Sequence, residues 1–254
     1  LSSERDRRMT VLLTPFMSCS AKMTIYLFFV NFLFDDPFVK VVVMAGLYLL
    51  GVLVGILTAL LLKSTLFRGD PVPFVMELPN YRFPSAKSVF LLMWEKAKDF
   101  LQKAFTVILL ASVTIWFFSS FDTGFYPVGE HAEASILAKL GGLLAVLFRP
   151  LGFGRWEAVT ALIAGFSAKE AVVSTLGMLT SGNVASLFTP ASAISFLVFT
   201  LIYTPCIAAV TAVRHELGTR RAALAVVFGQ CAIAWGVSFL VYRIANLFGH
   251  FSAV

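Results

Sequence analysis

The sequence predicts an all-α fold: a polytopic helical membrane protein with about six membrane segments, some broken or re-entrant, and one or two interfacial amphipathic helices. Of its 254 residues, 59% are hydrophobic and 13% charged, whereas soluble domains carry about 25% charged residues. Several uncharged runs reach the roughly 20 residues that a bilayer-crossing helix needs, and they lack the alternation of transmembrane β-strands. A soluble domain is therefore excluded, and the net charge of +6 is assigned to loops, without nucleic-acid binding.

Six stretches are long and apolar enough to be membrane segments: 10–34, 38–62, 104–121, 156–180, 191–213 and 222–242. The first of them is irregular, because Pro15 and the polar residues Ser18 to Ser20 precede Lys22 near its middle. A charge at that depth costs at least about 2.5–3.5 kcal/mol, so Lys22 should face protein or a watery cavity. Such helix-breaking residues are tolerated where the freed backbone groups line a cavity. The first segment is therefore predicted to be broken.

The second segment, 38–62, is regular, and the long polar connection 63–103 follows it. The connection begins with proline-rich turns and ends in an amphipathic helix, in which Phe90, Met93 and Trp94 share one face. We expect this helix to lie on the membrane surface and to lead into the third segment. The distribution of Lys and Arg favours a cytoplasmic position for the connection and leaves the topology of the second half open. A weaker apolar stretch at 135–148 is also expected at the interface.

The fourth segment carries Gly165, Ser167, Lys169 and Glu170 at its centre. Lys169 and Glu170 are adjacent and point about 100° apart on a helix, so a mutual ion pair is not expected. Lys169 either gates a cation path electrostatically or bonds backbone carbonyls at a helix break. The Ser-Ala-Lys sequence at 20–22 recurs at 167–169. Corresponding interruptions in two halves of a chain indicate a transporter's binding site, and the alternative is a coincidental packing motif.

The fifth segment contains a third break, because Pro205 removes a backbone donor beside Cys206. Cys19 likewise follows Pro15 by about one helical turn. The two thiols are candidate metal ligands, and the groups that would complete a mixed sulfur and oxygen set are Met17, Ser18, Ser20 and Glu170. Such a set suits a transiting transition metal such as Fe(II). The regular Cys and His spacing of a closed structural site is missing from the sequence. Cys231, in the sixth segment, is interpreted as a packing residue.

Four motifs together resemble the membrane domain of the ferrous iron transporter B (FeoB) family over nearly the whole chain: SCSAK at 18–22, PFVMELPNYRFP at 73–84, GFSAKEAVVSTLG at 165–177 and YTPCIAA at 203–209. The resemblance implies a multi-pass Fe(II) uptake protein of the bacterial inner membrane with two related Gate motifs. The family's metal-path cysteines would fall on Cys19 and Cys206. The residues expected to line or gate the path are Lys22, Ser167, Lys169 and Pro205. Met23 and Thr24 depart from the Leu-Pro that many members carry there.

The resemblance also implies an upstream GTPase domain that binds GTP and Mg. The chain has no G-x-x-x-x-G-K-[ST] phosphate loop, so it is expected to be the permease portion of a longer, non-enzymatic transporter. Its expected parts are a first Gate-like segment pair (1–62), the cytoplasmic connection (63–103) and a second Gate-like region (104–254). The expected partners are the bilayer, the GTPase domain, small cytoplasmic Feo proteins and further copies of the chain.

Two other functions remain open at this point. The chain is either a Gate-type carrier of a polar organic solute such as a nucleoside, bound by Lys169, Glu170 and hydroxyl groups, or a membrane scaffold whose broken helices are merely packed. The cysteines separate these functions, because only an iron path needs both thiols. A solute carrier would depend on Glu170 instead of the thiols, and a scaffold would depend neither on the thiols nor on Glu170.

Overall fold

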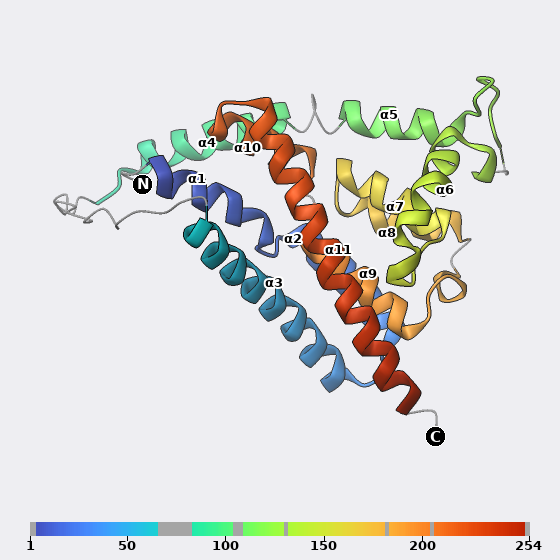
Figure 1. The fold of residues 1–254 in the computed structure, drawn as a ribbon. Helices are drawn as coiled ribbons and strands as arrows, with labels where there is room; N and C mark the ends of the chain where they lie inside the picture. The colour runs from blue at the N-terminus through green and yellow to red at the C-terminus, as the bar shows by residue number, and fades with distance from the viewer. Residues whose placement is uncertain are drawn as a thin grey trace.

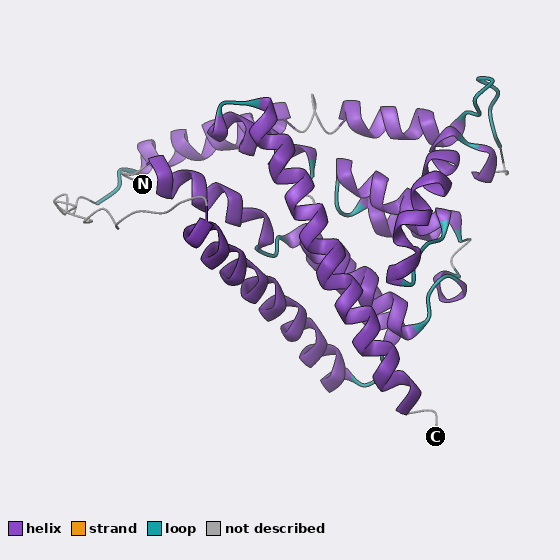
Figure 2. Ribbon diagram, in the orientation of Figure 1, coloured by secondary structure: helices purple, strands orange, loops and turns teal. Residues whose placement is uncertain are grey.

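The computed structural model describes residues 4–65, 83–103, 109–129, 132–180, 183–203 and 206–251. Within these ranges the regular elements are helices (Figure 2), and one isolated antiparallel bridge joins Phe121 to Pro127. The prediction of an all-α membrane protein is confirmed.

Three stretches of the described chain are long and apolar enough to cross a membrane as helices. They are Arg5–Leu33, α3 (Pro37–Thr65) and the Arg220–Leu247 part of α11 (Arg220–Phe251). α3 contains the long uncharged run 41–62 and carries Lys63 in its last turn, where a positive charge is stabilised by the negative end of the helix dipole. α11 begins just after Gly218, whose positive φ of 71° ends the preceding helix.

Three of the six expected segments are each divided into two helices. The first consists of α1 (Glu4–Leu13), a 3₁₀ turn η1 (Thr14–Phe16) and α2 (Ser20–Leu33). The fourth consists of α7 (Trp156–Ser167) and α8 (Ala171–Leu179), and the fifth of α9 (Pro190–Ile202) and α10 (Ile207–Leu217). The predicted breaks are thus present, and each falls at the polar or proline-containing positions that suggested it.

The region between the third and fourth segments differs from the prediction. α5 (Leu109–Ser120) is followed by α6 (Ile136–Phe148) and a 3₁₀ turn, η4 (Arg149–Leu151). We expected 135–148 at the interface, but α6 packs against α7, and the two form an apolar pair bent by 105°, as a broken span or a re-entrant loop would. Gly141 allows this approach, since a Cβ there would lie 2.3 Å from Thr160 Oγ1. With this pair, up to four segments of the described chain meet the length and composition criteria for crossing a membrane.

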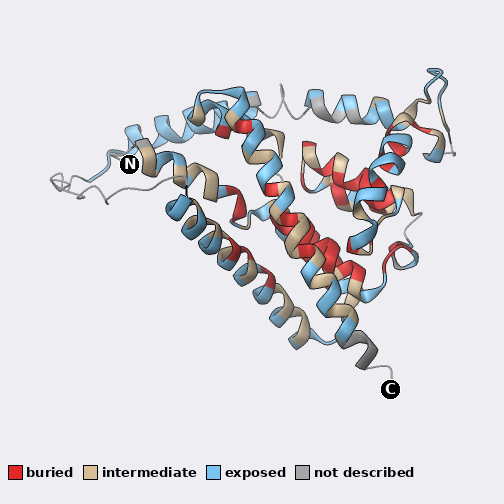
Figure 3. Ribbon diagram, in the orientation of Figure 1, coloured by how far each residue is buried: buried red, intermediate tan, exposed pale blue. Residues whose placement is uncertain are grey.

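The protein core is centred on α9, most of whose side chains are buried (Figure 3). α2 and α11 pack against α9, and a cluster of aromatic rings fills the contact, with Phe196 5.3 Å from Phe29 and 5.2 Å from Phe153 between ring centroids. α3 lies at the outside of the assembly with most of its apolar side chains uncovered (Figures 1 and 3). A bilayer would cover such a surface, so its exposure agrees with membrane residence.

The amphipathic helix of the long connection is α4 (Ala86–Lys103). Its apolar face stays uncovered by the described protein, with Phe90 68%, Met93 65% and Trp94 64% exposed. A helix of this kind is stabilised by lying in the membrane interface. The proline-rich motif before it lies, up to residue 82, outside the described residues.

Candidate functional site

The first helix break is built around Pro15. The chain leaves α1, makes the η1 turn and is extended at Met17 and Cys19 before α2 begins at Ser20. Lys22, one turn into α2, reaches back across the break: its Nζ donates to the carbonyl oxygens of Pro15 at 3.0 Å and Met17 at 3.1 Å. Carbonyls freed by a broken helix need a donor when buried, and a buried ammonium group needs acceptors. The Lys22 ammonium group therefore supplies the donor that the carbonyls need, and the carbonyls supply the acceptors that the ammonium group needs.

The second break separates Ser167, which ends α7, from α8. Ala168 is extended there, with φ −148° and ψ 128°. Lys169 is only 3% exposed, and its Nζ donates to the carbonyl oxygens of Thr200 and Tyr203, each at 3.4 Å. The same Nζ lies 3.3 Å from the centroid of the Tyr203 ring, which makes a cation–π contact. Lys169 therefore bonds carbonyls at the end of α9, the third break.

The third break follows Ile202 and is held from two sides. The Tyr203 side chain crosses to α7, where its hydroxyl donates to the Leu162 carbonyl at 3.3 Å. Gly165 leaves room for that crossing, because a Cβ there would lie 2.6 Å from Tyr203 Oη and 2.3 Å from Val172 Cγ2. Cys206 then precedes α10 as its N-cap residue. The predicted path residue Pro205 lies outside the described residues.

The three breaks lie close to one another. α2 packs against both α8 and α9, and η1 also contacts α9. Lys22 interacts electrostatically with Cys19 and Cys206, and Lys169 interacts with Lys22 and with all three thiols, Cys19, Cys206 and Cys231. The structure therefore brings together the two Ser-Ala-Lys motifs and the two cysteines that the sequence singled out from three separate segments.

The predicted ligands differ in how accessible they are. Cys19, Met17 and Ser20 are exposed beside the first break, and Cys206 is half-buried. Ser167 is buried, and its hydroxyl donates to Ala164 O at 2.8 Å. These groups therefore present a surface with one exposed thiol and one partly covered thiol.

Glu170 is exposed just before α8, whereas Lys169 is directed to α9, so the expected absence of a mutual ion pair agrees with their positions. Among the described side chains, no three His, Cys, Asp or Glu residues come together as a metal-binding group. Glu170 thus does not complete a closed set with the two cysteines.

Sequence reasoning missed two groups, one at the third break and one at the opposite end of α7 from the second break. Tyr203 was noted only as part of a motif, although its hydroxyl and ring hold the third break. Glu157, in the first turn of α7, is a buried carboxylate that accepts from Arg155 Nη2 at 3.0 Å. Its signal was available, because an acidic residue in the first turn is stabilised by the helix dipole, and a basic residue stands two positions before it.

Two family models and several curated proteins match this chain. Residues 44–96 match the family model described as the C terminus of ferrous iron transport protein B, and residues 101–220 match the Gate model, described as nucleoside recognition. The chain is 38% identical over 256 residues to an Fe(2+) transporter FeoB of Staphylococcus aureus (strain MSSA476), and 36% identical over 260 residues to one of Methanocaldococcus jannaschii.

These alignments cover 98% and 97% of the chain, but the chain spans only 38% of the length of each relative. A third relative, from Porphyromonas gingivalis, is named as a fusion of Fe(2+) transport protein A with the Fe(2+) transporter FeoB. It is 35% identical over 307 residues, which cover 98% of the chain and 35% of that protein. No solved structure matches the chain.

Proposed function

Because this chain belongs to the FeoB family, we propose that it moves Fe(II) across a membrane, with the ion passing between the three helix breaks and with Cys19 and Cys206 as transient ligands. The observation that supports this most is that both thiols lie within electrostatic range of both Ser-Ala-Lys lysines. Thiolate sulfur is a suitable ligand for such a metal. A transported ion must also leave again, which favours a site with few ligands.

The neighbouring residues have separate roles in this proposal. Lys22 and Lys169 hold the broken backbone in place, and their charges set a barrier that the ion crosses only when the thiolates offset it. Met17 and Ser20 add sulfur and oxygen ligands beside Cys19, and Ser167 and Pro205 line the path. Glu170, exposed at the second break, attracts the cation toward it.

The test is Fe(II) uptake by cells that express Cys19→Ser or Cys206→Ser, with protein level and membrane insertion measured in the same samples. Each change should lower uptake by roughly tenfold or more, at least as much as the loss of an outer-shell partner at a metal site. Cys231→Ser is the comparison variant: Cys231 lies in α11 within electrostatic range of Lys169 and Tyr203 but is not a proposed ligand, so its uptake should stay near wild type. Normal uptake by the Cys19→Ser, Cys206→Ser double variant would remove thiol ligation from the mechanism.

A second candidate is transport of a polar organic solute, favoured by the match of residues 101–220 to a family described as nucleoside recognition. On that alternative Glu170 binds a hydroxyl or amide of the solute and the thiols are bystanders. Glu170→Gln should then abolish uptake of a labelled nucleoside while both cysteine variants retain it. If Glu170→Gln instead lowers Fe(II) uptake severalfold without any nucleoside transport, the iron function stands.

The remaining parts of the proposal concern the longer protein. GTP and Mg would be bound by a separate domain, in keeping with the 38% of the relatives' length that this chain spans. A small Feo-type protein is a proposed partner because one relative is named as such a fusion. We also propose a multi-pass position in the bacterial inner membrane and assembly with further copies of the chain.

A further inference from the structure

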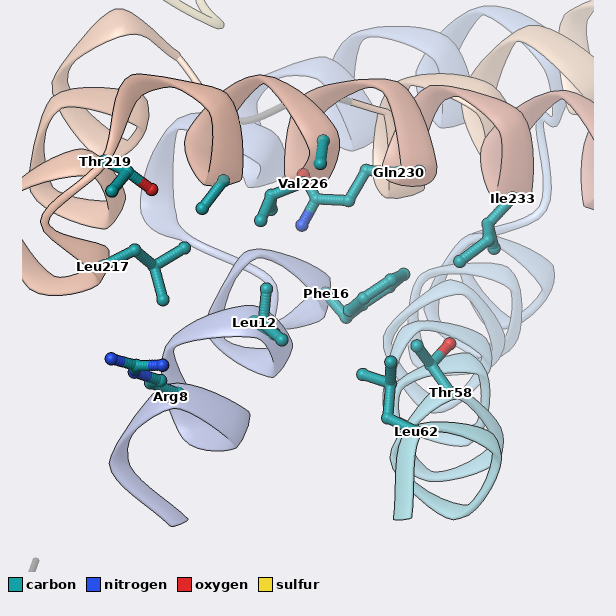
Figure 4. Close-up of a pocket in the computed structure, with 13 residues that line it drawn as sticks. Arg8, Leu12, Phe16, Thr58, Leu62, Leu217, Thr219, Val226, Gln230 and Ile233 are labelled. Carbon is teal, nitrogen blue, oxygen red and sulfur yellow. The ribbon is translucent and has the colours of Figure 1, made fainter. Parts of the chain in front are cut away.

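A cavity of about 630 Å³ lies between α1, the last turns of α3, the end of α10 and the first half of α11, and it reaches the first helix break at Phe16. Figure 4 shows Arg8 and Leu217 at one end of it, Phe16 and Ile233 at the other, and Gln230 between them. Its volume is in the range of small-molecule sites, roughly 300–1,000 Å³.

Gln230 is the unexplained group in this cavity. Its side chain is 3% exposed, and neither its amide nitrogen nor its amide oxygen has a hydrogen-bond partner among the described residues. The amide nitrogen is directed into the space above Leu12 and Phe16 (Figure 4). A buried amide without partners is unfavourable, so its position calls for a ligand that brings polar atoms to it.

The remaining lining indicates what kind of ligand that is. The walls are mostly apolar and include Leu12, Leu62 and Val226, and the one charged side chain among the lining residues is the cationic Arg8. With no carboxylate among them, these residues suit an anionic amphiphile and not a metal cation. The pocket is thus chemically distinct from the proposed iron path.

The place of the cavity in the fold narrows the choice of ligand further. Its Arg8 end lies where α3 finishes on Lys63-Ser64-Thr65 and where α11 starts on Arg220-Arg221. Basic residues at the ends of membrane helices favour the cytoplasmic side. Basic pockets between such helices bind the head groups of anionic lipids in that leaflet.

We propose that this pocket binds one anionic phospholipid. Its phosphate pairs with Arg8 beside the apolar side chains of Leu12, Leu62 and Val226. The glycerol ester region lies deeper and hydrogen-bonds to the Gln230 amide, and an acyl chain continues from there toward Phe16 and Ile233. The proposal does not rest on the transport function, although Phe16 places the inner end of the pocket beside the first helix break.

Gly229 offers a way to fill the pocket without disturbing its walls. It lines the cavity, and a Cβ at this position would meet nothing within 4 Å, so Gly229→Leu should place its side chain in the lipid's space. Gly236→Leu is the matched control, because Gly236 is on the same helix two turns later, also has nothing within 4 Å, and does not line the cavity.

The experiment measures lipid binding to the purified full chain in detergent, by native mass spectrometry and by the shift in melting temperature. The probes are phosphatidylglycerol and phosphatidylcholine in mixed micelles, and inorganic phosphate alone. Phosphatidylglycerol should bind and raise the melting temperature, Gly229→Leu should abolish both effects, and Gly236→Leu should keep them. Arg8→Gln should reduce the preference for phosphatidylglycerol over phosphatidylcholine by about tenfold, the loss expected for one charge-assisted contact.

Equal binding by the wild type and Gly229→Leu would overturn the proposal, as would an Arg8→Gln variant with unchanged lipid preference. A melting-temperature shift of the same size with inorganic phosphate alone would also overturn it, because the acyl chain would then contribute nothing. If Gly229→Leu fails to fold, two other variants test the proposal. Arg8→Gln should show a reduced preference for phosphatidylglycerol over phosphatidylcholine, and Gln230→Met should bind both lipids more weakly than the wild type.

Discussion

The two Ser-Ala-Lys motifs have the same sequence, but their lysines bond different parts of the fold. Lys22 bonds the carbonyls of Pro15 and Met17, five to seven residues before it, and so closes the break in its own segment. Lys169 bonds Thr200 and Tyr203, more than thirty residues later, and so joins the second break to the third. A repeated motif can therefore supply the same chemistry, an ammonium on freed carbonyls, with local consequences at one site and long-range consequences at the other.

The largest difference between the two sites should appear when the lysines are replaced. Lys169→Met removes the donor from two buried carbonyls and the cation from the Tyr203 ring, and each unsatisfied buried acceptor costs about 1–3 kcal/mol. We expect the melting temperature in detergent to fall sharply and the yield of membrane-inserted protein to drop. An unchanged melting temperature would show that Lys169 does not hold the second and third breaks together.

Gly165→Ala tests the tyrosine that completes the long-range site. The added methyl group would lie 2.6 Å from Tyr203 Oη and 2.3 Å from Val172 Cγ2, and overpacking of this kind costs about 1–3 kcal/mol. The matched control is Gly177→Ala in the neighbouring helix α8, where a Cβ meets nothing within 4 Å. The control should be neutral or slightly stabilising. Equal melting temperatures for the two variants would contradict the close crossing of Tyr203 over α7.

Lys22→Met should have a smaller effect on stability, because the Met17 side of the first break is exposed and water can replace the lost donor there. Its effect on Fe(II) uptake should exceed its effect on stability, since Cys19 stands in the sequence between Met17 and Lys22, in the short segment that these hydrogen bonds hold. Measuring both the uptake per inserted protein and the melting temperature of this variant separates its effect on transport from its effect on stability. A Lys22→Met protein as unstable as Lys169→Met would remove the distinction between a local and a long-range lysine.

The smallest effect is expected outside both sites, in the connection between α5 and α6. There the hydrogen bond from Lys139 holds the pKa of the exposed Asp122 carboxyl below its usual value. A carboxyl with a lowered folded pKa stabilises the fold above its unfolded pKa, about 3.9, and loses that contribution as the pH falls through the folded value. The melting temperature of Asp122→Asn should therefore lie slightly below wild type at pH 7 and converge with it near pH 3. A difference that persists at pH 3 would rule out this ion pair as its cause.

The sequence could predict the breaks because their causes are local. Pro15, the small polar residues and a charge in the middle of an apolar run are each unfavourable in a continuous membrane helix. It also offered carbonyl bonding as one of two roles for Lys169, and the structure confirms that contact. The electrostatic role of Lys169 in transport stays a prediction.

The partners of these groups could not be read from spacing. Nothing in the pattern around residue 169 indicates Thr200 and Tyr203, because that contact depends on how α9 packs against α2 and on how the Tyr203 side chain crosses to α7. The same reason hid the pairing of α6 with α7, which depends on Gly141 facing Thr160. The cavity at Gln230 forms only where α1, α3, α10 and α11 come together. A single Gln within an apolar helix therefore does not predict it.

The central claim, that Cys19 and Cys206 act on the same ion, is tested most directly by a double-mutant cycle on Fe(II) uptake. Uptake per inserted protein is measured for wild type, Cys19→Ser, Cys206→Ser and the double variant. If both thiols bind one transiting ion, either single change removes most of the uptake and the double variant loses little more, so the effects are strongly non-additive. Two independent losses that multiply in the double variant, or uptake near wild type in either single variant, would contradict a shared path at the three breaks.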